Sequence, residues 1–278
     1  MKHNNVVNTC LVSGVALAIT FLFAGSSSAL TLGDNITIYD EVSNDYLWHR
    51  SGEDEEVEPH MDHGQSWDLE GFFIDGTILN MVGGYDFENG YSDFVSGDIF
   101  IDVDGIPDYG PGNDHTGSGN DPVLNTFGYD YVLDMDFASG TFDIYSLSGD
   151  SVLTDTVYYY QNQESNPWQF DIEDNPDAEA LGVSEFDYYT GLSDQQVGGF
   201  EGASHNVVSL DLSALLNASD LPTALGDEMY FHFTMECGND NLMGRYDLPP
   251  VPEPASISIL SIGLAYLTFR KRRSGIRA

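Results

Sequence analysis

The chain has 278 residues and a formal net charge of −38, most of it concentrated in the middle of the sequence. Residues 30–250 hold 45 Asp and Glu against Arg50 and Arg245, a net charge of −43. Such a surface repels phosphate backbones, so we expect no nucleic-acid partner. Hydrophobic residues make up 41% and aromatic residues 13% of the chain, which is enough material for a packed core and argues against disorder.

The first 29 residues have the features of a secretory signal peptide. Lys2 supplies a basic start, residues 6–25 are largely apolar, and Ser27 and Ala29 fill the small-residue positions before a cleavage site. We therefore predict export through the Sec translocon and cleavage by signal peptidase between Ala29 and Leu30. The alternative is an uncleaved anchor helix. The mature domain predicted from this boundary covers residues 30–239.

Two polar segments open this domain. Residues 53–58 are an acidic run typical of a solvated loop. His60, Asp62 and His63 follow, and this residue set binds zinc or copper in some proteins, but no third anchor accompanies it. A polar loop is the competing interpretation.

Most of the domain shows the period-two alternation of β-strands. Segments with this pattern are 35–40, 67–74, 77–82, 98–104, 129–137, 141–147, 151–160, 168–172, 185–189, 207–212 and 229–235. Turns rich in Gly, Asn, Asp and Ser separate them, and Ser139-Gly140 between two strong runs predicts a hairpin. Short strands at this spacing predict an all-β fold, an antiparallel β-sandwich or jelly roll. A short helix over 214–218 is the one helical segment expected in the domain.

An acidic segment around the fourth of these strands is the candidate metal site. Its oxygen ligands would come from the strand end and from the Gly- and Pro-rich loop after it, a mixture that suits calcium. The candidate calcium ligands are Asp98, Asp102, Asp104, Asp108, Asn113 and Asp114. An EF-hand is excluded by the spacing, and the alternative is a solvated acidic edge strand that blocks aggregation. No other cofactor is expected.

Two further chemistries remain open. Glycosidases use two carboxylates across a cleft, but none of the 45 acids stands out as such a pair. Exposed aromatic side chains could instead stack on sugar rings. The candidates are Tyr85, Tyr158, Tyr159, Tyr160, Trp168, Tyr188 and Tyr189. Core packing is the alternative for all of them. His205 is interpreted as part of a turn or as a structural hydrogen-bonding residue.

The last predicted strand leads to Cys237, the one cysteine left after signal cleavage. Met229, Phe231, Phe233 and Met235 alternate with polar residues, the pattern of a half-buried strand. Cys237 continues the inward register, so we predict that its thiol is buried; an intermolecular disulfide is the alternative.

The C-terminus has three elements in order. Residues 240–254 are a Pro-rich linker, residues 255–278 contain an apolar stretch over 255–269, and a basic cluster follows it. The stretch is about 22 Å long as a helix, short of a ~30 Å hydrocarbon core, and flanking residues can make up the difference. The basic cluster would keep the end in the cytoplasm. We therefore predict a single C-terminal membrane helix.

This arrangement resembles the PEP-CTERM sorting signal of Gram-negative bacteria. The resemblance makes Val251, Pro252, Glu253 and Pro254 the sorting box, and Arg270, Lys271, Arg272 and Arg273 the stop-transfer cluster. Residues 234–240, Thr-Met-Glu-Cys-Gly-Asn-Asp, are similar to a segment found just before the box in such proteins, and they are interpreted as a last strand running into a turn. The resemblance implies processing by an exosortase, an inner-membrane precursor and release to the surface or matrix.

The leading hypothesis is therefore a non-enzymatic, exported cell-surface or extracellular-matrix protein associated with exopolysaccharide and biofilm. A calcium-dependent carbohydrate-binding or adhesive module is the second hypothesis, and a secreted hydrolase is the third.

Overall fold

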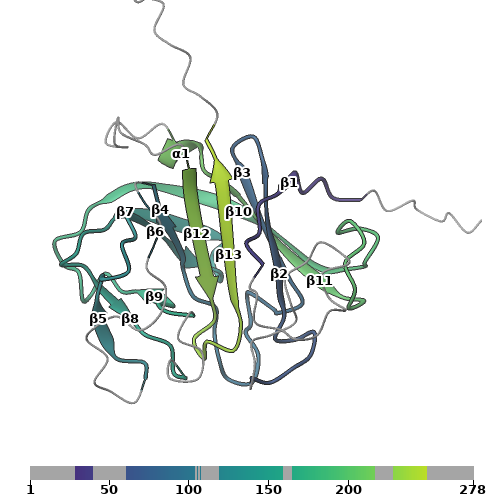
Figure 1. Ribbon diagram of the computed structural model, residues 1–278, viewed down its shortest axis with the longest axis horizontal. Coiled ribbons are helices and arrows are strands. Elements are labelled where there is room, and N and C mark those ends of the chain that lie inside the picture. Colours follow the sequence, from purple (N-terminus) through teal and green to yellow (C-terminus); the bar gives the residue numbers. More distant parts are fainter. Residues whose placement is uncertain are drawn as a thin grey trace, which may run out of the picture.

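Antiparallel strands build nearly all of the structure, a computed structural model that describes residues 29–39, 61–103, 105, 107, 119–158, 165–216 and 228–248 (Figure 1). The expected all-β class is confirmed. The strands are β1 (Asp34–Asn35), β2 (Leu69–Asp75), β3 (Ile78–Gly83), β4 (Ile99–Asp102), β5 (Pro122–Leu124), β6 (Tyr131–Asp136), β7 (Thr141–Ser146), β8 (Val152–Thr154), β9 (Gln169–Phe170), β10 (Ala180–Leu192), β11 (His205–Asp211), β12 (Glu228–Thr234) and β13 (Asn241–Asp247). A single turn of helix, α1 (Ser213–Leu216), completes the described elements.

Ten of these strands form one curled sheet in the order β1-β2-β3-β11-β10-β7-β6-β4-β12-β13. The segment after β1 joins the two ends of this sheet. The Ile36 N–H donates to the Phe72 carbonyl of β2, and the Ile36 carbonyl accepts from the Arg245 N–H of β13. Thr37 bridges to Gly244 in the same way. The N-terminal segment therefore closes the sheet on itself, and the paired backbone leaves no open edge at this position.

The main core fills the inside of this curled sheet. It contains inward residues of both halves, including Leu79, Leu133, Val208 and Phe231. A three-stranded sheet, in the order β5-β8-β9, covers part of the outer face and encloses a second cluster around Phe100. The arrangement is sandwich-like, because inner faces from both halves pack against each other.

The predicted hairpin at Ser139-Gly140 is confirmed. β6 pairs with β7 from Tyr131↔Ser146 to Asp136↔Thr141, and Gly140 adopts a positive φ of 70° in the turn between them. β10 is much longer than the expected 185–189. Its first part pairs with β7 and its second part with β11, so it connects the two halves of the sheet.

The strand that contains Met229, Phe231, Phe233 and Met235 has the predicted register. All four side chains lie in the main core, and Cys237 is buried at 1% exposure, as predicted. The strand is not half-buried, however. His232 on its other face is fully buried, because Phe100, Tyr129 and the Pro167 carbonyl cover it.

The predicted linker boundary at residue 240 is wrong, because Asn241–Asp247 form β13. β13 pairs with β12 along its whole length, from Thr234↔Asn241 to Glu228↔Asp247. The segment 234–240 is therefore a turn between two strands and does not follow a last strand. Gly244 interrupts the alternation that would have identified β13, and its missing side chain lets Phe72 pack closely against the backbone.

The helix predicted over 214–218 is present as α1 up to Leu216, and residues 217 and 218 lie outside the described residues. Within the described ranges, no helix has the length and apolar character needed to cross a membrane. The predicted signal peptide up to residue 28 and the apolar stretch 255–269 lie outside those ranges.

Candidate functional site

The structure describes two of the six candidate calcium ligands, and each is bound separately to backbone. Asp98 precedes β4 and accepts hydrogen bonds from the N–H groups of Met135 (2.9 Å) and Phe170 (2.8 Å). Asp102 ends β4 and accepts from the Gly105 N–H at 2.9 Å. Within the described chain, no group of three or more His, Cys, Asp or Glu side chains has the arrangement of a metal site.

The remaining candidate ligands, Asp104, Asp108, Asn113 and Asp114, lie outside the described residues. The calcium site therefore stays a prediction. The alternative of a solvated edge strand is wrong for β4, because β4 pairs with both β6 and β12. Asp98 and Asp102 are also buried, at 4% and 2% exposure.

Asp98 faces a second acid, Asp134 of β6. Burial raises the pKa of Asp98 well above its ordinary value, and the charge of Asp134 raises it further. Burial, followed by the charge of Asp143, raises the pKa of Asp134 to about 6. These acids therefore retain protons at mildly acidic pH, which lowers the repulsion between them.

The polar segment after residue 60 is anchored through its backbone. The Asp62 N–H donates to the Asn239 side-chain oxygen at 2.9 Å, and the Asn239 amide donates back to the Asp62 carbonyl at 2.8 Å. The side chains of Asp62 and His63 are exposed, as expected for a polar loop, and His60 lies outside the described residues.

The predicted signal-cleavage residues lie at the beginning of the described chain. The Leu30 N–H donates to the Gln196 carbonyl at 2.9 Å, and Leu32 is buried against Phe73 and Val207. The sorting box 251–254 and the basic cluster 270–273 lie outside the described residues.

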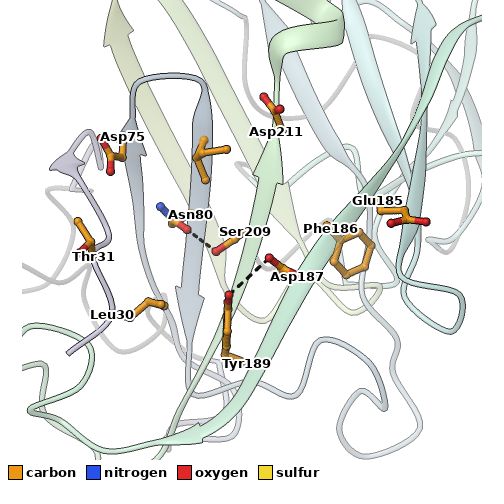
Figure 2. Close-up of a pocket in the computed structure, with 11 residues that line it drawn as sticks. Leu30, Thr31, Asp75, Asn80, Glu185, Phe186, Asp187, Tyr189, Ser209 and Asp211 are labelled. Atoms are coloured by element: carbon orange, nitrogen blue, oxygen red, sulfur yellow. Dashed lines mark hydrogen bonds between the residues drawn. The ribbon is translucent and has the colours of Figure 1, made fainter. Parts of the chain in front are cut away.

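An open groove of about 470 Å³ crosses the outer face of β3, β11 and β10, and it is the candidate functional site (Figure 2). Strand alternation produces it, because Leu79, Val208 and Leu210 point into the core while their neighbours point outward. The residues that line the groove are Leu30, Thr31, Asp75, Ile78, Asn80, Glu185, Phe186, Asp187, Tyr189, Ser209 and Asp211.

The floor of the groove is polar and held in place by hydrogen bonds. The Ser209 hydroxyl donates to the Asn80 side-chain oxygen, and the Asn80 amide donates to the Leu32 carbonyl at 2.7 Å. Tyr189 is 37% exposed, and its hydroxyl donates to Asp187 at 3.5 Å (Figure 2). Among the aromatic residues considered from the sequence, Tyr85 and Trp168 are buried, whereas Tyr189 is exposed and lines this groove.

Among the described residues, four carboxylates and no basic side chain line the groove. Asp75 and Asp211 lie near one end, and Glu185 and Asp187 lie along β10 (Figure 2). Carboxylates accept hydrogen bonds from hydroxyl groups, and an aromatic ring offers a flat apolar surface. The groove therefore suits a neutral or cationic polyhydroxylated ligand and repels an anionic one.

Sequence reasoning included Tyr189 among several aromatic candidates but did not single out the groove carboxylates. The alternation of Glu185, Asp187 and Tyr189 with less exposed residues was a usable signal for one wall. The opposite wall is contributed by residues more than a hundred positions earlier, and local sequence carries no information about that pairing.

Comparisons with protein-family models, with curated proteins and with solved structures gave no match to this chain.

Proposed function

We propose that this chain is an exported, non-enzymatic protein of the cell surface or extracellular matrix, sorted and cleaved by an exosortase. The sequence order supports this proposal: a secretory signal, an acidic domain, a Pro-Glu-Pro box, an apolar stretch and a basic end. We also propose that the curled sheet belongs with the β-sandwiches or jelly rolls.

The observation that carries the proposal is the position of Leu30. It directly follows the predicted signal-cleavage bond, and it is already bound to the folded domain through the Gln196 carbonyl. Leu32 follows in an apolar cluster. A folded domain that begins at the predicted cleavage bond is consistent with signal cleavage, and the acid-lined groove is consistent with a hydrated, polysaccharide-rich environment.

Replacing Pro252, Glu253 and Pro254 by alanine tests the sorting step. In the native host we expect uncleaved precursor in the inner membrane fraction and loss of the released form. Replacing Pro249 and Pro250 by alanine is the matched control, because it removes two prolines just outside the box. Normal release of the box variant would contradict the family resemblance. N-terminal sequencing of the released protein should give Leu30 as its first residue.

Carbohydrate binding in the groove is the second candidate function. The specific observation in its favour is the exposed Tyr189 ring beside the Asp187 carboxylate and the fixed Asn80–Ser209 pair. An aromatic ring that packs on a sugar face, next to acceptors for its hydroxyl groups, is a common way of binding saccharides. Neutral matrix polysaccharide is the ligand class that this groove suits.

A glycan array probed with the full exported domain tests this function. We expect binding to neutral glycans that is lost in Tyr189→Ala and kept in Tyr91→Ala, which removes an exposed tyrosine outside the groove. Repeating the array with a chelator distinguishes calcium-dependent from calcium-independent binding. Equal binding by both variants would exclude the groove. Release of reducing ends from a bound glycan would favour the hydrolase instead.

A further inference from the structure

A histidine lies between two carboxylates at the covered end of the same sheet face. His205, the first residue of β11, contacts both oxygens of Glu70 of β2 through Nδ1, each at 2.7 Å. Its Nε2 lies 3.1 Å from Oδ1 of Asp194, which belongs to the loop 193–204. The side chains of His205 and Glu70 are completely buried, whereas that of Asp194 is 38% exposed.

The hydrogen-bonding capacity of these groups fixes the protonation state of this arrangement. An ionised carboxylate only accepts hydrogen bonds, and a neutral imidazole has one N–H. Since both ring nitrogens of His205 face carboxylate oxygens, both must carry a proton for both contacts to be favourable. The arrangement is therefore that of an imidazolium between two anions.

Asp194 connects this histidine to the whole loop. Its Oδ1 also accepts the Ala203 N–H at 2.8 Å, and its carbonyl accepts the Gly199 N–H at 2.6 Å. One carboxylate thus holds both ends of the loop 193–204. Asp194 has a lowered pKa, because the hydrogen bond from His205 favours its charged form.

The loop covers an apolar part of the outer sheet face. Val197 and Phe200 are buried, at 1% and 4% exposure, on a surface formed by Phe73, Val82 and Val207. The Gln196 carbonyl in the same loop accepts the Leu30 N–H, and Leu30 lines the neighbouring groove. Movement of this loop would therefore uncover apolar surface and release one wall of the groove.

The groups around His205 determine the direction of its response to pH. The charged groups beside His205 are Glu70 and Asp194. The uncharged side chains nearby are Gln65 and Phe200, and Leu192 of β10 is the residue that pairs with His205 in the sheet. Burial by itself would lower the pKa of His205, but the hydrogen bonds and charges of Glu70 and Asp194 raise it. The charged form therefore persists to higher pH than in an unperturbed histidine.

We propose that His205 is a proton-dependent latch that holds the loop 193–204 over the apolar surface and releases it when the ring loses its proton. After deprotonation, the remaining ring N–H, on Nδ1, stays hydrogen-bonded to the fully buried Glu70 carboxylate. The lone pair of Nε2 then faces the Asp194 carboxylate. Repulsion between that lone pair and the carboxylate weakens the attachment of the loop at Asp194. The latch is closed while the ring is protonated and opens as pH rises and the ring loses its proton.

Nuclear magnetic resonance of the exported domain provides the test. The ring signals of His205 should titrate above pH ~6.5, the ordinary value for histidine. Amide exchange at Ala203, corrected for its intrinsic dependence on pH, should rise about tenfold or more over the same titration, since one pH unit corresponds to a tenfold change in proton occupancy.

Two variants separate the latch from a structural role. In Glu70→Gln with His205→Gln, the buried charge and the titrating ring are both removed, so corrected exchange at Ala203 should be independent of pH. Glu179→Gln removes one carboxylate outside the loop and should keep the wild-type profile. The proposal is overturned if His205 titrates at or below its ordinary value, or if exchange at Ala203 does not follow the ring. It is also overturned if the double variant keeps the wild-type response.

Discussion

At the scale of single residues, burial decides the chemistry of the ionisable groups more than sequence neighbours do. Cys237 lies among acidic residues in sequence, yet burial is the main cause that raises the pKa of its thiol to about 12. A thiol of this kind is a small apolar side chain and a poor nucleophile. His232 and His205 are both buried, but burial lowers the pKa of His232, whereas the hydrogen bonds and charges of Glu70 and Asp194 raise the pKa of His205.

His232 should make the protein sensitive to acid. Burial lowers its pKa to about 4, while in the unfolded chain it takes up a proton near 6.5. Because the unfolded state binds this proton first, stability is lost as pH falls from about 6.5 to about 4, by an amount on the order of 3 kcal/mol. Urea unfolding of wild type and His232→Gln across this range should show a smaller acid-induced loss in the variant.

Asp134 changes the stability with pH in the opposite direction to His232. The effect of His232 therefore has to be measured as the difference in stability between wild type and His232→Gln. The Asp134 pKa of about 6 means that the stability this residue contributes is present at low pH and is lost as pH rises through that value. The variant Asp134→Asn should therefore remove a stabilising effect of acid. Parallel pH profiles for wild type and His232→Gln would contradict the assignment of His232.

Gly97 should be intolerant of any side chain. A Cβ at this position would overlap the backbone carbonyl oxygens of Trp168 and Thr234, which are held in place because each accepts a backbone hydrogen bond, from Asp98 and Gly97. We expect Gly97→Ala to lower the free energy of unfolding by roughly 2 kcal/mol. Gly149→Ala is the matched control, because its Cβ meets open space, and it should change stability by less than about 0.5 kcal/mol. Equal effects of the two substitutions in urea melts would contradict this packing.

At the scale of elements, the N-terminal segment and β13 depend on each other. The backbone of residues 36–38 bonds to β13 on one side, and Ile36 also bonds toward β2 on the other. Asp240, just before β13, accepts the Leu69 N–H of β2 at 2.6 Å. The closure of the sheet therefore needs both the segment after β1 and β13.

Truncation tests whether the folded domain depends on residues 249–278. A chain that ends at Leu248 keeps β13. Its thermal midpoint should stay within about 2 °C of that of the longer protein, which corresponds to a change of less than about 1 kcal/mol in the free energy of unfolding for a domain of this size. A chain that ends at Asp240 loses the seven residues of β13 and the burial of Leu242. We expect that shorter chain to show no cooperative unfolding by circular dichroism. A folded 30–240 fragment would show that β13 is dispensable.

At the scale of the whole molecule, uncompensated negative charge works against a well-packed core. Arg245 contacts Glu228 and lies 3.6 Å from Asp247, and it is the one lysine or arginine between residues 51 and 269. Self-repulsion of this kind destabilises the compact state and is screened by salt, with a Debye length of about 8 Å near physiological ionic strength.

Salt should therefore stabilise the domain, and calcium should be tested separately. The melting temperature should rise steadily with sodium chloride. At fixed ionic strength, a saturable rise with calcium would indicate a specific site, worth about 2.7 kcal/mol at a hundredfold excess over Kd. Loss of that rise in Asp102→Asn with Asp104→Asn would assign it to the predicted segment. Equal, unsaturable effects of magnesium and calcium would show screening alone.

The sequence by itself determined the class of fold and most strand positions, because the alternation of apolar and polar residues depends on local geometry. It determined the hairpin at Ser139-Gly140 and the burial of Cys237 for the same reason. Tertiary structure alone decided that Asn241–Asp247 form a strand, because the partner β12 compensates for an interrupted pattern. It also decided that β4 is covered on both faces and that Glu70 and His205, 135 residues apart, share a buried contact. These features depend on which strands become neighbours, and pairing between distant strands leaves no periodic trace in either of them.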